Sequence, residues 1–327
     1  MTTFSRHRRQ WILAFRIVST VLALVYVGWK LYDRRAEMER MWGSGWEGSR
    51  MALLGVVIGL MGLNYALEAQ KWRIILKPFY AVLSLGKSVV AVFAGMAAGV
   101  FTPNRIGEYA GRILFLAEGR RVEAIVATFI DRICQLLVTL VTGFAAFGGL
   151  IWRDAGVAGA LLQDPGVRLL FVIFTLAMTV FIGLFLAAPG RLAGLLPGAW
   201  SKSEWVRKLK YAMEHLPWRL VRRVLGLSFL RYMVFSSQYV LLMLAFGYQV
   251  EDGLLLAYCM VALIFLGKSV LPVMGIFELG VRESVAILVM SYYGVDPVCA
   301  FSSTFLLYLI NILLPTLIGV VALQRIE

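Results

Sequence analysis

Two stretches of this 327-residue chain decide its fold, GVFTPNRIGEYAGR at residues 99–112 and GKSVLPVMGIFELGVRE at residues 267–283. Each interrupts a long apolar region, Leu83 to Leu116 in the first case and Leu254 to Tyr293 in the second. Pro removes a backbone hydrogen-bond donor and Gly admits unusual dihedral angles, so each stretch is expected to break a helix. Each also carries a Glu that is followed four residues later by an Arg.

The composition places these broken stretches in a membrane. Hydrophobic residues make up 60% of the chain and charged residues only 16%, and the mean hydropathy is +0.80. Ordinary soluble domains carry roughly one-quarter charged residues, so most soluble enzyme classes are excluded. The 32 Lys and Arg exceed the 19 Asp and Glu, giving a net charge of +13. In a membrane protein this excess indicates cytoplasmic loops and anionic lipid head groups as partners, and no nucleic acid.

The sequence predicts neither a cofactor nor a metal site. The three cysteines lie in apolar stretches without a CxxC spacing, at Cys134, Cys259 and Cys299, and the two histidines are far apart. The triplet GKS occurs at residues 86–88 and 267–269, but the GxxxxGK[ST] spacing of a phosphate-binding loop is absent. We therefore expect no disulfide, no metal centre and no nucleotide.

Six other stretches are apolar enough to cross a bilayer, which takes about 20 residues. They run approximately from Trp11 to Leu31, Met51 to Leu67, Glu123 to Ile151, Arg168 to Ala188, Leu225 to Gly247 and Val298 to Leu323. The first follows a basic N-terminus but lacks a small-residue cleavage site, so we expect a retained anchor.

Lys and Arg in the short loops set the expected orientation. The N-terminus, the segment from Lys71 to Lys77 and the loop between the fourth and fifth spans are basic, so they are assigned to the cytoplasm. Within that loop, residues 200–224 mix Trp and Tyr with Lys and Arg, which suits an interfacial helix or, equally, a plain cytoplasmic loop. Both termini are then cytoplasmic, in a multi-pass protein of the cytoplasmic (inner) cell membrane.

The broken regions lie between the second and third spans and between the fifth and sixth. Their pieces, such as 87–101 and 106–117, are too short to cross alone, so we expect two re-entrant hairpins. The halves 1–160 and 165–327 each contain three crossings, an odd number, and are therefore expected to be inverted relative to each other. The predicted fold is an all-α integral membrane protein, a single polytopic domain over 1–327, with six spans, two hairpins and a substrate site between them.

Ionisable residues at membrane depth are costly and are therefore functional candidates. Glu108 and Arg112 would share one helix face and could pair, whereas Asp131 and Arg132 point about 100° apart and each need another partner. We expect Glu108 to be the partner of Arg132. The candidate substrate-binding residues are Pro103, Asn104, Arg105, Glu108, Arg112, Asp131, Arg132, Lys268, Pro272, Glu278, Arg282 and Glu283.

Structural explanations compete with these functional ones. The Glu108 and Arg112 pair, and the matching pair in the second hairpin, could merely neutralise each other to permit insertion. For Asn311 in the last span, an interhelical hydrogen bond is favoured over a ligand contact. Gly95 and Gly99 form a small-xxx-small pattern that favours close helix packing.

The chain resembles the lysylphosphatidylglycerol synthase transmembrane region family. The matching pieces are KWRIIL at residues 71–76, the stretch from Pro103 to Arg112, the pair Asp131-Arg132, and Pro272 through Glu283. The resemblance implies a flippase-like module that moves a lipid, such as an aminoacylated phosphatidylglycerol, between leaflets. Related modules also occur with glycosyltransferases acting on polyprenol-linked substrates, so the lipid class stays open.

Two departures from the family pattern bear on these expectations. No soluble aminoacyltransferase domain follows residue 327, so we do not expect the chain to make a lysyl lipid by that route. Asn104-Arg105 and Phe277-Glu278 stand where glycine-rich turns are usual, which changes the expected geometry of the site.

The leading hypothesis is a translocase for a phospholipid or a polyprenyl-phosphate-linked lipid, and not an enzyme. Arg105, Arg112, Lys268 and Arg282 would contact phosphate, because guanidinium and ammonium groups suit anionic oxygens. The rivals are a membrane enzyme acting on a lipid or polyprenol phosphate, with Asp131 or Glu283 as base, and a non-catalytic envelope scaffold. A second copy of the chain or a lipid-modifying enzyme would be the protein partner.

Overall fold

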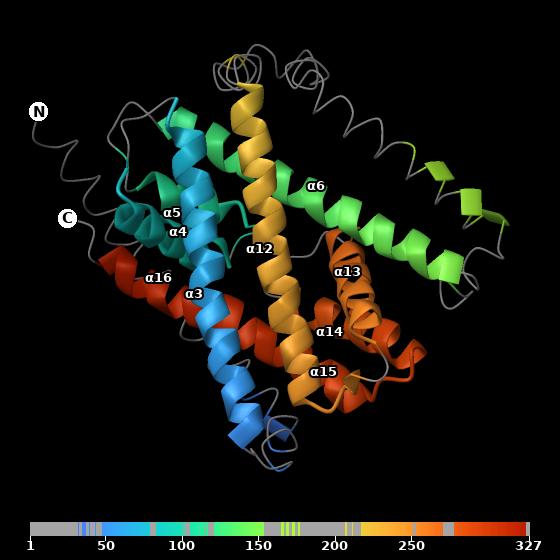
Figure 1. The fold of residues 1–327 in the computed structure, drawn as a ribbon. Coiled ribbons are helices and arrows are strands. Elements are labelled where there is room, and N and C mark those ends of the chain that lie inside the picture. Colours follow the sequence, from blue (N-terminus) through green and yellow to red (C-terminus); the bar gives the residue numbers. More distant parts are fainter. Residues whose placement is uncertain are drawn as a thin grey trace, which may run out of the picture.

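The structure is a computed structural model that describes most of the chain from residue 48 onward (Figure 1). The described residues are 48–78, 83–100, 102, 105–114, 116, 121–153, 217–250, 253–270 and 278–324, with isolated positions between 32 and 43, between 165 and 176, and at 207 and 211. Regular structure in these residues is helical, without a strand. The first predicted span lies outside them and the fourth lies mostly outside them.

Four helical stretches in the described part of the chain are long and apolar enough to cross a membrane. They are α3 (Gly48–Leu76), the stretch Ala124–Leu150 of α6 (Arg121–Arg153), α12 (Trp218–Ala245), and Pro297–Gln324. The last comprises α15 (Pro297–Tyr308), the π-helical turn η2 (Leu309–Leu313) and α16 (Leu314–Gln324). These helices match the second, third, fifth and sixth predicted spans.

Two helices are longer than predicted, because charged residues lower the hydropathy at the end of α3 and at the start of α12. α3 continues past Leu67 to Leu76, since buried contacts of its last turns compensate their charged residues. α12 begins at Trp218, directly after the N-cap residue Pro217. Residues 218–224 of the predicted interfacial segment therefore form its first turns.

The two broken regions each form a pair of shorter helices. The first pair is α4 (Leu85–Gly99) and α5 (Gly107–Ile113), and the second is α13 (Leu254–Val270) and α14 (Glu278–Tyr292). The helix break predicted from Pro and Gly is confirmed at the first place, where residues 102, 105 and 106 form a bend and a turn. The residues between α13 and α14 lie outside the described part of the chain. Ser84 caps the start of α4, since its side-chain oxygen accepts a hydrogen bond from the backbone N–H of Lys87 at 3.3 Å.

Small residues bring α4 and α5 into backbone contact. A Cβ atom added at Gly111 would lie 2.6 Å from the carbonyl oxygen of Ala94, and one added at Gly95 would lie 2.9 Å from Cγ of Arg112. The close packing predicted for Gly95 and Gly99 is thus confirmed. Thr102 stabilises the turn between α4 and α5. Its hydroxyl donates a hydrogen bond to the carbonyl of Gly99 at 3.0 Å and accepts one from the N–H of Gly107 at 2.7 Å.

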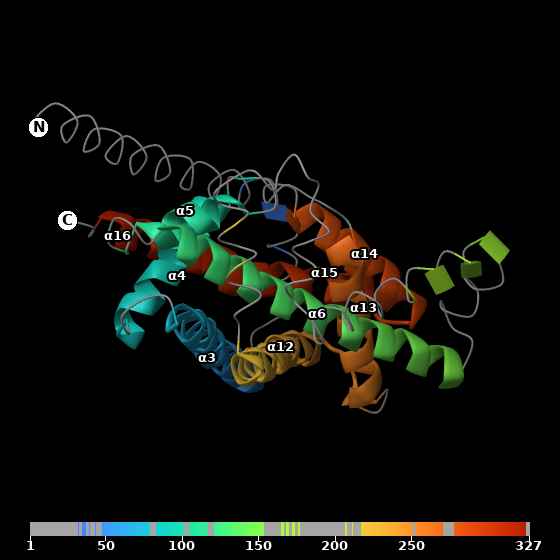
Figure 2. The same ribbon diagram turned by 90° about the horizontal axis from the view of Figure 1, so that it is seen from above.

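Helices of the two halves pack against each other. α3 lies beside α12, as both views show (Figures 1 and 2). α6 of the first half packs on α13 of the second, while α16 of the second half packs on α4 of the first. In each case the last long helix of one half packs on the first short helix of the other half. In the described residues, each half consists of a long helix, a pair of short helices and a second long helix. Their inverted orientation in a membrane stays a prediction.

Candidate functional site

The helices bury a network of charged side chains centred on Glu68 of α3. Its Oε1 atom accepts hydrogen bonds from Nη2 of Arg112 at 2.6 Å and from Nη2 of Arg132 at 2.9 Å. Its Oε2 atom lies 3.2 Å from Nε of Arg231 and 3.6 Å from Nζ of Lys71. One buried carboxylate therefore contacts cations from α3, α5, α6 and α12.

Glu108 of α5 is the second carboxylate of this network. It forms ion pairs with Arg112 and with Arg132, so both predicted partners of Glu108 are confirmed. The Arg112 guanidinium also lies over the ring of Trp72, 5.6 Å from its centroid. Arg112 is fully buried, whereas the side chain of Arg132 is 30% exposed. Of the two arginines that pair with Glu108, Arg132 is therefore the one that is accessible to solvent.

Asp131 of α6 is the third carboxylate, and Lys71 is its partner. Nζ of Lys71 lies 2.8 Å from Oδ1 of Asp131 and donates hydrogen bonds to Gln135 and Ser228, each at 3.2 Å. Nη1 of Arg112 lies 3.7 Å from Oδ2 of Asp131. The sequence predicts Lys71 to be an ordinary charge of a cytoplasmic segment, but its side chain is fully buried in the network. The side of the membrane on which this end of α3 lies stays a prediction.

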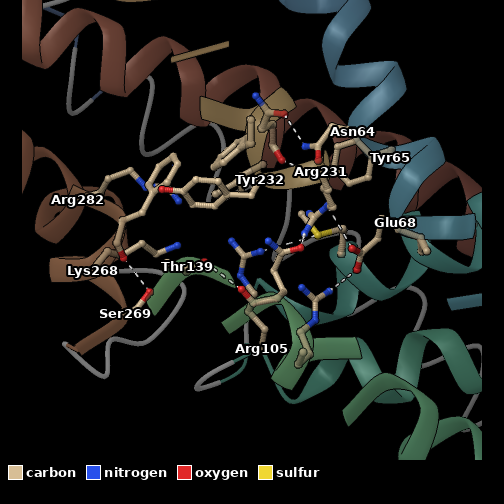
Figure 3. Close-up of a pocket in the computed structure, with 18 residues that line it drawn as sticks. Asn64, Tyr65, Glu68, Arg105, Thr139, Arg231, Tyr232, Lys268, Ser269 and Arg282 are labelled. Atoms are coloured by element: carbon tan, nitrogen blue, oxygen red, sulfur yellow. Dashed lines mark hydrogen bonds and ion pairs between the residues drawn. The ribbon is translucent and has the colours of Figure 1, made fainter. Parts of the chain in front are cut away.

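A cavity of about 190 Å³ opens beside the network (Figure 3). Its walls come from α3, α4, α6, α12, α13, α14 and η2, together with the turn before α5. Figure 3 shows Lys268 and Arg282 on one side of the cavity, and Glu68 and Arg231 on the other. The lining residues are Asn64, Tyr65, Glu68, Val92, Met96, Arg105, Arg132, Gln135, Thr139, Arg231, Tyr232, Phe235, Phe265, Lys268, Ser269, Arg282, Asn311 and Ile312.

Arg105 reaches the cavity from an unusual backbone conformation. Its φ of 56° is in the left-handed region, which non-glycine residues rarely adopt and which costs about 1 kcal/mol or more. It lies two residues before the start of α5, and its Nη1 atom lies 3.9 Å from Sδ of Met96. Such outliers concentrate at binding and switch sites, so the strain at Arg105 supports a functional role.

The π-helical turn η2 forms another part of the cavity wall. Pro315 has no N–H group, so the carbonyl of Asn311, four residues earlier, lacks its ordinary helical donor. The Tyr65 hydroxyl donates a hydrogen bond to this carbonyl, and Nδ2 of Asn64 donates to Oδ1 of Asn311 at 3.2 Å. The predicted interhelical hydrogen bond of Asn311 is confirmed. Asn311 also lines the cavity, and π-helical turns recur at functional sites.

These features occur in a chain that matches a known family over most of its length. The lysylphosphatidylglycerol synthase TM region family matches residues 11–319. The chain belongs to this family. It is therefore a multi-pass membrane protein of a family associated with lipid metabolism or transport. Comparisons with curated proteins and with solved structures found no match.

The structure divides the predicted site residues into three groups. Arg105, Arg132, Lys268 and Arg282 line the cavity. Glu108, Arg112 and Asp131 lie behind it in the buried network, and Glu283 is buried at 3% exposure but is not a lining residue. Pro103, Asn104 and Pro272 lie outside the described residues, as does the side chain of Glu278.

Three charged residues of the buried network were not predicted from the sequence. Glu68 and Lys71 fall just beyond the predicted end of the second span, whereas Arg231 lies well inside the predicted fifth span. Arg231 could have been found, because an Arg within an apolar span is by itself a functional candidate. Asn64, Glu68, Lys71 and Trp72 recur at helical spacing, which places them on one face of α3.

The described residues offer no group of three or more His, Cys, Asp or Glu side chains that could hold a metal ion. The carboxylates Glu68, Glu108 and Asp131 instead face Lys and Arg. What this arrangement can do is bind a small polar group with the basic side chains on the cavity wall.

Proposed function

We propose that this chain moves a lipid between the two leaflets of a membrane, with the polar head group in the cavity and the chains in the bilayer. The observation that carries the proposal is a charged cavity whose walls come from both halves. Glu68 and Arg132 contribute from the first half, and Arg231, Lys268 and Arg282 contribute from the second. In transporters built from repeats, the substrate site lies between the repeats and includes broken helices.

The cavity suits an amphipathic substrate. Phe235 stacks on Phe265 with ring centroids 5.1 Å apart, and Tyr232 meets the edge of Phe265 at 5.8 Å. These rings and Val92 form apolar wall beside the basic side chains. Fixed charged groups can replace the water that a head group loses on entering the membrane interior, which is otherwise costly. Rocking of one half against the other would then expose the cavity to either leaflet.

The enzyme alternative receives less support from the site. Asp131 and Glu283 were its candidate bases, but neither lines the cavity. Asp131 is fully buried, with its carboxylate oxygens directed at Lys71 and Arg112. A base must approach the proton that it removes to hydrogen-bonding distance. We therefore favour a transporter over an enzyme.

The proposal includes the setting of the protein. We place it in the cytoplasmic membrane with both termini in the cytoplasm, as the basic loops predict. Anionic lipids would surround its many Lys and Arg, and a second copy or a lipid-modifying enzyme would be its protein partner.

Leaflet exchange in liposomes tests the proposal. The purified chain is reconstituted with a fluorescent phospholipid or a fluorescent polyprenyl phosphate, and a membrane-impermeant quencher measures how much probe reaches the outer leaflet. We expect protein-dependent exchange of at least one probe. Arg231→Gln removes a cavity cation and should slow the exchange about tenfold or more, because an ionic hydrogen bond to the substrate is lost.

Arg223→Gln is the matched control, since Arg223 is exposed on the same helix, two turns before Arg231. This variant should exchange lipid at the wild-type rate. If the folded wild type moves neither probe faster than empty liposomes do, the translocase proposal fails.

A further inference from the structure

The charges around the cavity do not balance. Among the described lining residues, five are basic, namely Arg105, Arg132, Arg231, Lys268 and Arg282, and one is a carboxylate, Glu68. The network behind the wall adds two more cations, Lys71 and Arg112, and two more carboxylates, Glu108 and Asp131. Buried Glu283, next to Arg282 in the chain, adds a fourth carboxylate.

This imbalance holds however the individual groups are paired. The described side chains of the network and the cavity comprise seven cations and four carboxylates, so three positive charges exceed the negative ones. Even with Glu278 counted as a fifth carboxylate, an excess of two remains. The summed positive charge of these side chains gives the cavity a positive potential, which favours an anionic ligand and disfavours a cationic one.

The size of the cavity restricts the ligand further. Its volume of about 190 Å³ is below the roughly 300–1,000 Å³ of sites that hold drug-sized molecules. A phosphate, or a phosphate with one small attached group, is compatible with this space. An oligosaccharide is not.

We infer that the lipid carried by this chain has a compact, anionic phosphate head group, and that it is neither a cationic aminoacyl lipid nor a lipid-linked oligosaccharide. The inference rests on the proposed function and names its substrate class. Arginine guanidinium groups bind phosphate oxygens through paired hydrogen bonds, and lysine does so as a point charge. A phosphate between Lys268 and Arg282 on one side and Arg231 on the other would meet three cations of the second half (Figure 3).

Binding measured without transport tests the inference separately from the proposed function. The full chain in detergent micelles is titrated with dioctanoyl phosphatidic acid, dioctanoyl phosphatidylcholine and a dioctanoyl lysyl-phosphatidylglycerol, and binding is followed by native mass spectrometry. Phosphatidic acid should bind at least about tenfold more tightly than the other two, because the surplus cations favour negative charge. Glycerol 3-phosphate, which has the same head group without chains, should bind far more weakly than the lipid.

Two substitutions at one position separate charge from folding. Lys268→Gln should weaken phosphatidic acid binding about tenfold, whereas Lys268→Arg should retain it. Arg223→Gln again serves as the exposed control and should bind like the wild type. A loss of binding shared by Lys268→Gln and Lys268→Arg would contradict the charge argument.

The outcomes distinguish the two claims. Equal or tighter binding of the lysyl lipid overturns the inferred substrate class, whatever the liposome experiment shows. Glycerol 3-phosphate binding as tightly as phosphatidic acid overturns a lipid as the source of the phosphate. Selective binding of phosphatidic acid without leaflet exchange supports the inferred ligand and refutes the translocase.

Discussion

Lys71 and Asp131 form an ion pair with Nζ and Oδ1 2.8 Å apart, although each side chain is fully buried. The pair joins α3 to α6, two helices long enough to cross a membrane. Burying two charges is costly, and close contact with additional hydrogen bonds is needed to offset that cost. Gln135 and Ser228 provide those bonds to Lys71. The pair therefore fixes how three helices meet, since Ser228 belongs to α12.

Removing one member of this pair should destabilise the protein strongly. Lys71→Met leaves the carboxylate of Asp131 buried without its closest cation, which we expect to lower the free energy of unfolding by about 3–5 kcal/mol. Denaturation of the purified protein with sodium dodecyl sulfate, followed by loss of helical circular dichroism, measures the change.

The double variant Lys71→Met and Asp131→Leu supplies the control. It removes both charges, so it should recover a large part of the stability lost in Lys71→Met. A double variant no more stable than the single one would show that the pair does not act as a unit.

Much of the fold follows from local features of the sequence. Gly99 and Gly107 mark the helix ends at the first break, because Pro103 between them cannot donate a backbone hydrogen bond. The pairing of Glu108 with Arg112 follows from helical spacing, and that with Arg132 follows from the need of a buried cation for a partner.

The rest of the site depends on contacts that no local pattern reveals. Glu68 lies where the hydropathy of α3 has fallen, so its burial requires cations from α5, α6 and α12 that are distant in the chain. Hydropathy likewise treats Lys71 as a loop charge, because it cannot detect Asp131 across the helix interface. Charge excludes a residue from the interior only when tertiary structure provides no partner.

The contact between α4 and α5 should tolerate no larger residue at Gly111. An alanine Cβ there would lie 2.6 Å from the carbonyl oxygen of Ala94 and 2.7 Å from Cα of Gly95. Both atoms belong to the backbone, so the helices would have to separate, and Gly111→Ala should cost about 1–3 kcal/mol. Gly59→Ala on α3 is the matched control, because nothing lies within 4 Å of its added Cβ. The melting temperature should fall for purified Gly111→Ala and should not fall for purified Gly59→Ala.

The hydrogen bond from Tyr65 to the carbonyl of Asn311 should depend on Pro315. In the wild type, Tyr65→Phe leaves that carbonyl without the hydroxyl donor, which should cost about 1–2 kcal/mol of stability. Pro315→Ala restores a backbone N–H that can donate to Asn311 in an ordinary α-helix. Tyr65→Phe should then cost much less in the Pro315→Ala background.

A double-mutant cycle of these two substitutions measures the coupling directly. Four purified proteins are compared by denaturant unfolding, and the coupling energy should approach the cost of Tyr65→Phe alone. A coupling near zero would show that the proline does not create the need for the tyrosine hydroxyl. The π-helical turn would then have another cause.

The inverted arrangement of the two halves predicts opposite accessibility of the two breaks. Asn104→Cys and Met274→Cys are made singly in a chain whose native Cys134, Cys259 and Cys299 are replaced by alanine. A membrane-impermeant maleimide is then applied to right-side-out and to inverted membrane vesicles. Because an odd number of crossings separates corresponding points of the two halves, the two cysteines should react preferentially from opposite sides. Labelling after solubilisation in detergent checks that both thiols are reactive, and labelling of both from the same side would refute the inversion.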